Sequence, residues 1–201
     1  MAVSAARQHL VIFARQPQYG VGKRRLAAEV GELAASRFQR FALRDLLRGL
    51  GGDPRWRTWI AVTPDRPIHW LRNAEQLPQG RGDLGERLRR VASRLPKGAI
   101  VILGSDAPQV TAGDVATAFR ALGGSDAVIG PAVDGGYWLV GLSPRQRAQP
   151  PFANVRWSTP DALTDTLENL KTRRIRLLRE LEDVDDAASL RRLCAKSKRL
   201  P

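Results

Sequence analysis

The sequence contains a single cysteine and a single methionine, and it has no long hydrophobic run. A lone cysteine cannot form a disulfide within the chain, which favours a reducing compartment. No apolar stretch approaches the roughly 20 residues that a transmembrane helix needs. The run from His9 to Ala14 ends at the charged Arg15 and is too short for the core of a signal peptide. These absences predict a cytoplasmic protein without a membrane segment.

Acidic residues are scarce relative to basic ones, because 20 Asp and Glu stand against 33 Lys and Arg and leave a net charge of +13. Such an excess favours an anionic partner, either nucleic acid or a phosphorylated small molecule, although an arginine-rich surface alone also accounts for it. Only 6% of residues are aromatic, which leaves little stacking surface for single strands. No helix-turn-helix, zinc or RNP-type signature is visible. Nucleic acid is therefore the less favoured partner.

The 201 residues, 43% of them apolar, predict one folded domain over 1–201. Short apolar runs typical of covered strands occur at His9–Ala14, Thr58–Thr63, Ala99–Gly104 and Ala127–Pro131, and YWLVGL (137–142) predicts another. Segments of helical spacing separate them. This alternation predicts an α/β sandwich with a largely parallel sheet.

Helix starts are marked by capping residues. Thr111 followed by Asp114 predicts a capping box, and Asp83 is suited to cap the amphipathic helix that begins at Leu84. Ser158 or Thr159 is expected to cap a further helix whose first turn contains Pro160. After Lys171 a last strand and a closing helix are expected.

Ligands of open α/β sheets bind beyond the carboxyl ends of the strands, so the segments that follow strands are candidates for a site. The first, ARQPQYGVGKRRL (14–26), places Gly20 and Gly22 before Lys23, Arg24 and Arg25. Glycines let main-chain N–H groups approach an anion, and the cations neutralise phosphate oxygens. The pattern is neither a Walker A motif nor G-x-G-x-x-G, and a tight turn before a basic helix explains it about as well.

Two carboxylates follow later strands. In GSDAP, after Gly104, Asp106 is a candidate ligand for a divalent ion, although capping of the next turn is the simpler interpretation. In GPAVDGGYWLVGL, Asp134 precedes Gly135 and Gly136, and an Asp-Gly pair is also a common hairpin signal. If both carboxylates and the basic loop lie at the same edge of the sheet, they form a magnesium-phosphate site.

The segments FARQPQYGVGKRRL, GDLGERL, ILGSDAP, VIGPAVDGGYWLVGL, FANVRWST and EDVDDAASL, in this order, cover roughly residues 9–190. Together they resemble a bacterial family of poorly characterised transferases with the nucleotide-diphospho-sugar transferase, or glycosyltransferase-A-like, fold. Molybdenum-cofactor and phospholactate guanylyltransferases share that fold.

The resemblance implies a three-layer α/β/α sandwich, Rossmann-like, with a mixed and mostly parallel sheet that binds a nucleotide. In it, Lys23 and Arg25 match the family's basic loop, and Asp106 stands where the superfamily holds a divalent metal, Mg²⁺ or Mn²⁺. Asp106 is a lone acidic residue where many glycosyltransferases have Asp-x-Asp, so Asp134 is chosen as the second metal ligand. We assign Lys23, Arg25 and Asp106 as catalytic. Nucleotide binding is expected at the residues Gly20, Gly22, Asp83, Gly104, Gly135 and Gly136.

The resemblance then implies a magnesium-dependent transferase that takes a nucleotide donor and a small-molecule acceptor. Nucleotidyl transfer from a nucleoside triphosphate to a small phosphorylated acceptor is favoured, because the basic loop resembles that of the guanylyltransferases. Glycosyl transfer from a nucleotide-sugar needs the same metal clamp and remains an alternative. A non-catalytic protein that binds a nucleotide or nucleic acid is the third possibility. Trp157, Ser158 and Thr159 are candidates for the acceptor side, with burial of Trp157 in the core equally compatible with the sequence.

Overall fold

The computed structural model describes residues 8–71, 74–184 and 186–196. The strands are β1 (Gln8–Arg15), β2 (Arg57–Thr63), β3 (Glu75–Pro78), β4 (Ala99–Gly104), β5 (Ala127–Pro131), β6 (Tyr137–Leu142) and β7 (Ile175–Leu177). The helices are α1 (Arg24–Val30), α2 (Glu32–Leu50), α3 (Leu84–Arg94), α4 (Ala112–Ala121), α5 (Ala162–Glu168) and α6 (Ala187–Lys196), with a short 3-10 helix, η1, at Gln146–Ala148. No helix among these residues is long and apolar enough to cross a membrane.

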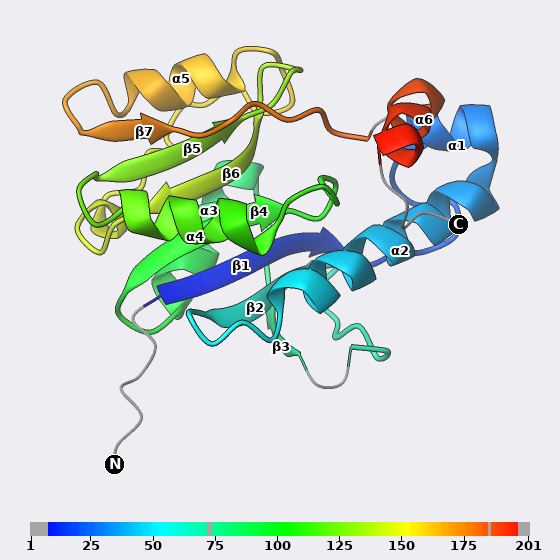
Figure 1. Ribbon diagram of the computed structural model, residues 1–201, viewed down its shortest axis with the longest axis horizontal. Helices are drawn as coiled ribbons and strands as arrows, with labels where there is room; N and C mark the ends of the chain where they lie inside the picture. Colours follow the sequence, from blue (N-terminus) through cyan, green and yellow to red (C-terminus); the bar gives the residue numbers. More distant parts are fainter. Residues whose placement is uncertain (1–7, 72–73, 185, 197–201) are drawn as a thin grey trace.

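The strands form one mixed sheet in the order β3-β2-β1-β4-β6-β5-β7 (Figure 1). Neighbouring strands are parallel except for β6, which runs antiparallel to both β4 and β5. The carboxyl ends of β1, β2 and β4 therefore meet at one edge of the sheet. The predicted α/β class and the mostly parallel sheet are confirmed.

Helices cover both faces of the sheet because alternate strand residues point to opposite sides. Leu10 and Ile12 of β1 pack with α2 and α4 on one face, whereas Val11 packs with α3 on the other. Figure 1 shows α2 and α4 on the near face. The continuous apolar runs are thus strands buried on both faces, as their sequence predicts.

A smaller apolar cluster lies at the end of the molecule that carries α1 and α6 (Figure 1). Leu26 of α1, Phe38 of α2 and Val184 are buried there, and Leu190 of α6 packs against them. The chain reaches this cluster from both termini, because α1 follows the loop after β1 and α6 is the closing helix. The cluster therefore ties the segment after β1 to the C-terminal segment.

Two features differ from the sequence-based expectation. Neither Ser158 nor Thr159 caps α5: the N-cap is Asp161, which makes no side-chain capping bond. The Thr159 hydroxyl instead accepts a hydrogen bond from the Asp161 amide, so a local turn uses the hydroxyl before the helix begins. The short edge strand β3, EQLP, was not predicted, because it lacks the apolar run that marks the other strands.

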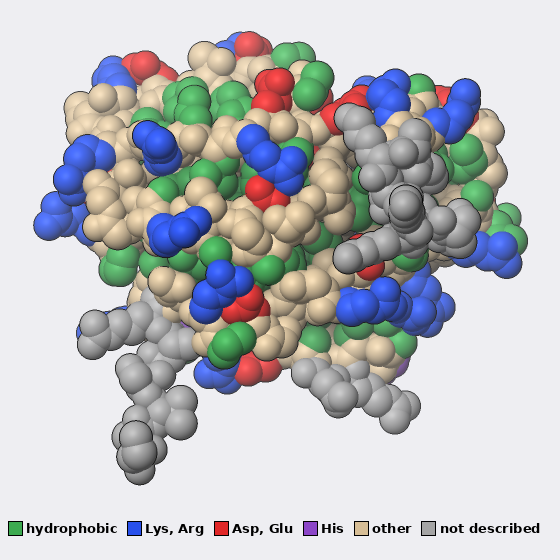
Figure 2. Space-filling model, viewed as in Figure 1, with side chains coloured by type: hydrophobic (Ala, Val, Ile, Leu, Met, Phe, Trp, Pro, Cys, Tyr) green, Lys and Arg blue, Asp and Glu red, His purple; other side chains and the backbone are tan. Residues whose placement is uncertain are grey.

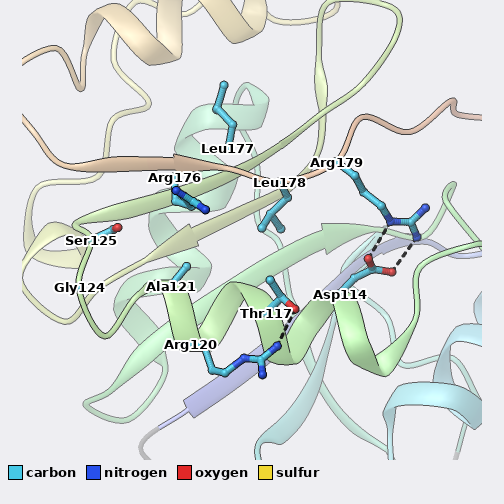
Figure 3. A pocket seen from close by; sticks show the side chains of 10 residues that line it. All are labelled: Asp114, Thr117, Arg120, Ala121, Gly124, Ser125, Arg176, Leu177, Leu178 and Arg179. Atoms are coloured by element: carbon cyan, nitrogen blue, oxygen red, sulfur yellow. Dashed lines mark hydrogen bonds and ion pairs between the residues drawn. The ribbon is translucent and has the colours of Figure 1, made fainter.

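The excess positive charge does not gather on the side of the molecule shown in Figure 2. Lysine and arginine side chains are scattered over this side, several of them beside acidic ones. Arg179 and Asp114 form such an ion pair, with a distance of 2.8 Å (Figure 3). A nucleic-acid interface usually shows clustered cations, so this side of the molecule does not resemble one.

Candidate active site

The basic loop after β1 is a tight turn that carries Lys23 into the interior. Gly20 and Gly22 have positive φ angles of 72° and 82°, and a Cβ atom at Gly22 would lie 2.9 Å from the Gln39 amide nitrogen. Lys23 itself adopts the left-handed conformation with φ 45° and is the N-cap of α1. A non-glycine residue in this region is uncommon and is found in turns and at functional sites. The loop conformation thus directs Lys23, whereas Arg25 in the first turn of α1 is exposed.

Lys23, in the loop that follows β1, forms an ion pair with Asp106, in the loop that follows β4. The Lys23 Nζ lies 3.2 Å from the Asp106 Oδ2. The Lys23 side chain is 6% exposed, whereas the Asp106 side chain is 51% exposed. Gly104 ends β4, and the Ser105 amide donates to the carbonyl of Phe13 in β1, which holds the two loops together. Parallel pairing of β1 and β4 therefore places a buried cation against a solvent-facing carboxylate.

An extended C-terminal segment, residues 181–184, crosses the same edge of the sheet. The Val184 amide donates to the Asp106 carbonyl at 3.5 Å, and the Val133 amide donates to the Leu181 carbonyl at 3.1 Å. The loops that carry Asp106 and Asp134 therefore contact opposite ends of this segment. Asp183 lies between these two contacts, which makes it a further acidic residue at this edge. Sequence reasoning assigned it no role, although the acidic run EDVDD was the available signal.

Asp134 shapes the turn between β5 and β6. Its Oδ1 accepts a hydrogen bond from the Gly136 amide at 2.9 Å. Gly135, with φ 84°, is so close to the following loop that a Cβ atom would lie 2.2 Å from the Pro160 carbonyl oxygen. The hairpin interpretation of Asp-Gly-Gly is thus correct. Both glycines act in this turn, where no ligand is needed to explain them.

The assignment of Asp106 and Asp134 as the two metal ligands stays a prediction. Across the residues that the structure describes, no group of three or more His, Cys, Asp or Glu side chains is arranged to hold a metal ion. Asp106 nevertheless presents a half-exposed carboxylate, which is a hard oxygen donor of the kind that Mg²⁺ prefers. Magnesium commonly uses one or two carboxylates and completes its shell with water and substrate phosphates. The Asp106 carboxylate therefore fits a metal that arrives with a phosphate ligand.

Asp83 caps α3 as the structural interpretation of GDLGERL predicts. Its Oδ1 accepts from the Glu86 amide at 2.7 Å, and the Glu86 side chain accepts from the Asp83 amide at 3.1 Å. The neighbouring Gly85 packs against the indole of Trp157, where a Cβ atom would lie 2.9 Å from Nε1. The GDLGERL and WST segments are therefore in contact, although they are more than 70 residues apart.

The WST loop combines a core anchor with an exposed, strained residue. Trp157 is half-buried and packs edge-on against Tyr137 with ring centroids 6.2 Å apart. Burial raises the pKa of the Tyr137 phenol well above its usual range, so this group stays protonated. Ser158 is exposed and has a φ of 62°. Trp157 therefore serves packing, and Ser158 remains a prediction for the acceptor side.

A second residue that sequence reasoning missed is Gln79, which follows β3. Its side chain is 3% exposed, and its Nε2 donates to the carbonyls of Ala14 at 3.2 Å and Ala61 at 2.8 Å. These carbonyls lie near the carboxyl ends of β1 and β2. Gln79 thus fixes the spacing of the two strands where the basic loop begins.

A groove between α4 and β7 lies apart from these loops (Figure 3). Two of its arginines are engaged by neighbours, since Arg179 binds Asp114 and Arg120 donates to the Thr117 hydroxyl. Burial alone would raise the pKa of Asp114, but the hydrogen bonds from Arg179 and Thr111 outweigh it and lower the pKa. None of the sequence-predicted site residues lines this groove.

More than half of the chain matches a known family model. Residues 46–159, more than half of its length, match the family described as uncharacterized protein conserved in bacteria (DUF2064). The chain belongs to this family. A search of curated proteins finds no match.

Solved structures extend the comparison to the whole fold. A candidate nucleotide-diphospho-sugar transferase from Desulfovibrio desulfuricans G20 superposes with a TM-score of 0.89 at 27% identity, covering 96% of this chain and 89% of the other. CMP:2-keto-3-deoxy-manno-octonic acid synthetase, solved with CTP, has a TM-score of 0.55 at 14% identity, with 94% and 98% covered. A Mycobacterium tuberculosis H37Rv protein solved with manganese has a TM-score of 0.56 at 17% identity, again with 94% and 98% covered. The present chain thus has the nucleotide-diphospho-sugar transferase fold that the sequence resemblance implies.

Proposed function

We propose that the protein is a metal-dependent transferase that uses a nucleotide donor, and that it transfers a nucleotidyl group from a nucleoside triphosphate to a small phosphorylated acceptor. The observation that carries this proposal is the pairing of a buried Lys23 with a half-exposed Asp106 at the carboxyl ends of two parallel strands. Ligands of open α/β sheets bind at this edge. A cation and a metal-binding carboxylate are the two groups that a triphosphate and its metal require.

Each residue has a defined part in this reaction. Lys23 and Arg25 bind the phosphate oxygens and neutralise the charge that grows on the leaving group. The Asp106 carboxylate holds Mg²⁺ or Mn²⁺, with Asp134 as the proposed second ligand. The metal, when bound, supplies Lewis-acid stabilisation of the phosphoryl oxygens. The main-chain N–H groups of the loop that contains Gly20 and Gly22 are available to orient the polyphosphate.

The bond changes follow from an in-line displacement. A nucleophilic oxygen of the acceptor forms a bond to the α-phosphorus of the donor. The bond from that phosphorus to its bridging oxygen breaks, and pyrophosphate leaves with the electron pair. The acceptor nucleophile is most reactive as an oxyanion, such as the phosphate oxygen of a phosphorylated acceptor, so no protein base is needed. The complex of a fold neighbour with CTP is in keeping with a triphosphate donor.

Glycosyl transfer from a nucleotide-sugar is the second candidate. It is favoured by the similarity to the Desulfovibrio protein, which is described as a candidate nucleotide-diphospho-sugar transferase. Both reactions use a metal bound to phosphates, and they differ in the bond that breaks. Release of pyrophosphate supports nucleotidyl transfer, whereas release of a nucleoside diphosphate supports glycosyl transfer.

A thermal-shift screen tests the proposal directly. Nucleoside triphosphates and nucleotide-sugars are compared with and without Mg²⁺, because a ligand that binds the native state raises its apparent stability. We expect a Mg²⁺-dependent shift with one triphosphate, and loss of that shift in Asp106→Asn. Glu168→Gln, which neutralises an exposed carboxylate on α5, is the matched control and keeps the shift. The absence of a shift with every triphosphate and nucleotide-sugar contradicts the proposal.

A further inference from the structure

Contacts of α1 with the rest of the fold fix the position of the Lys23 ammonium. Lys23 is the N-cap of α1, and its carbonyl accepts from the Ala27 amide at 2.8 Å. The buried Leu26 and Ala27 anchor α1 in the cluster that also holds Val184. Val184 in turn donates to the carbonyl of Asp106. The loop that carries the cation and the loop that carries the carboxylate are therefore held by the same C-terminal segment.

A metal ion bound by Asp106 must share this carboxylate with Lys23. A divalent cation binds a carboxylate oxygen at about 2.0–2.6 Å. The Lys23 ammonium already lies 3.2 Å from one oxygen of that carboxylate, and its side chain is 6% exposed. Two cations this close repel each other, and a buried one is poorly screened by water. Binding of free metal at Asp106 is thus opposed by Lys23.

A polyphosphate removes this opposition. Its oxygens accept the Lys23 ammonium and also supply ligands to the metal, so the repulsion between the two cations is replaced by attraction of both to one anion. Asp106 alone offers too few ligands for tight binding of free metal. The repulsion by Lys23 and the small number of ligands at Asp106 both weaken the binding of free metal relative to that of a metal-polyphosphate complex.

We propose that Lys23 holds the cation position beside Asp106 and thereby makes metal binding and polyphosphate binding mutually dependent. This inference rests on the proposed function and gives Lys23 a further part in it: the Lys23 charge opposes free metal at Asp106, and neither free metal nor a monophosphate replaces that charge efficiently. Thermodynamic linkage requires the coupling to be reciprocal, so metal strengthens the binding of polyphosphate by the factor by which polyphosphate strengthens the binding of metal.

Equilibrium dialysis with Mn²⁺ tests the inference without turnover. Protein-bound Mn²⁺ is measured at matched free Mn²⁺ in the full chain, with no anion, with inorganic phosphate and with inorganic tripolyphosphate. For the unmodified protein we expect weak Mn²⁺ binding alone and binding at least about tenfold tighter with tripolyphosphate, with little effect of phosphate. Lys23→Met removes the charge at similar length, and its Mn²⁺ binding alone should tighten about tenfold while the tripolyphosphate effect shrinks.

Three further variants locate the effect. Lys23→Arg retains a cation and should keep Mn²⁺ binding alone weak. Arg89→Met removes an exposed cation on α3 and should leave Mn²⁺ binding unchanged, which controls for the net charge of the protein. Lys23→Met combined with Asp106→Asn should lose the tight site. Circular dichroism of each variant confirms that the fold is retained.

Equal or weaker Mn²⁺ binding in a folded Lys23→Met variant overturns the inference. The proposed function is judged separately by the nucleotide screen. If Lys23→Met tightens Mn²⁺ binding but no nucleotide binds, the opposition of Lys23 to metal stands and the nucleotide-dependent function fails. If a nucleotide binds with Mg²⁺ but Lys23→Met leaves Mn²⁺ binding unchanged, the function stands and the inference fails.

Discussion

The two ends of the sheet use buried cations in opposite ways. At the amino end of β4, the Arg147 guanidinium donates to the carbonyls of Ala92 at 2.7 Å and Pro96 at 2.5 Å, and also to that of Leu95. Burial lowers the pKa of Arg147, but these acceptors are main-chain oxygens around the end of α3. At the carboxyl end, the Lys23 side chain is 6% exposed, but that of its partner Asp106 is 51% exposed.

The difference separates a charge that the fold uses from a charge that we propose is used in function. Arg147 binds carbonyls that α3 leaves without partners at its C-terminus, so its donors are used by the fold itself. Lys23 binds a carboxylate that still has oxygen exposed, and its own backbone is in the left-handed region. A charge whose partner remains accessible can be exchanged for a ligand. The comparison therefore predicts that variants at the carboxyl end change binding, and that variants at the amino end change stability.

Asp106→Asn should have the largest effect on function. Loss of the carboxylate removes the metal clamp, and we expect the transfer rate to fall about a thousandfold. The free energy of unfolding should fall by about 1–2 kcal/mol, less than in Arg147→Ala, because the amide oxygen of the introduced asparagine still accepts from the buried Lys23 ammonium. Initial rates with the triphosphate found by the screen, together with urea unfolding, measure the two quantities. An active Asp106→Asn variant would remove the distinction between the two ends.

Arg147→Ala should show the opposite pattern. Removing the guanidinium leaves several main-chain carbonyls without a charged donor, which should cost about 3 kcal/mol of unfolding free energy. Arg147→Lys should recover only part of this, since an ammonium cannot reach the carbonyls as a planar fork does. The dissociation constant of the metal-triphosphate complex at a temperature where both proteins are folded should be unchanged. A weakened complex with an unchanged melting temperature would contradict the structural role.

Gly135→Ala sharpens the comparison within the carboxyl end. A Cβ atom would lie 2.2 Å from the Pro160 carbonyl oxygen, and φ is 84°. Overpacking and left-handed strain together should cost about 2–3 kcal/mol. Gly20→Ala is the control for strain alone, because its φ is 72° but no atom lies within 4 Å of the added carbon. It should cost about 1 kcal/mol. Equal costs in urea unfolding would show that the packing against Pro160 is not tight.

At the amino end of the sheet, His9 should have the smallest effect, a change in stability with pH. Its Nδ1 accepts from the Trp59 indole at 3.3 Å, and burial lowers the pKa of the imidazole. The neutral form is therefore favoured in the folded state. The resulting stability is present above the unfolded pKa of about 6.5 and is lost as the pH falls through the lower folded pKa, by at most about 1.4 kcal/mol per pH unit. Urea unfolding between pH 7.5 and 5 measures it, and His9→Gln should flatten the dependence.

Local signals predict the elements of this fold well. Five strands are found from their apolar runs, and the capping box at Thr111 and the helix cap at Asp83 form as predicted. Edge strand β3 is not predictable from the sequence, because its four half-polar residues show no periodicity. The sequence does not show that α1 and α2 are separate helices, since the break depends on the backbone of Gly31, with φ 84°.

The site is only partly predictable, because its contacts join distant segments. Lys23 and Asp106 are identifiable as residues that follow strands, but their 3.2 Å pairing depends on the adjacency of β1 and β4. The approach of residues 181–184 depends on the packing of α6 against α1, which no local pattern reveals. The ligand role of Asp134 stays a prediction, and the structure shows in addition that its carboxylate accepts from the Gly136 amide, as short carboxylates in turns commonly do.

The most direct test of the account is a crystal structure of the protein grown with Mn²⁺ and a non-hydrolysable triphosphate, with manganese located by its anomalous scattering. We predict manganese at about 2.2 Å from an Asp106 carboxylate oxygen, with phosphate oxygens completing its coordination and the Lys23 ammonium moved from Asp106 to the phosphates. Manganese and triphosphate bound away from Asp106, or bound there with Lys23 still on the carboxylate, would contradict it.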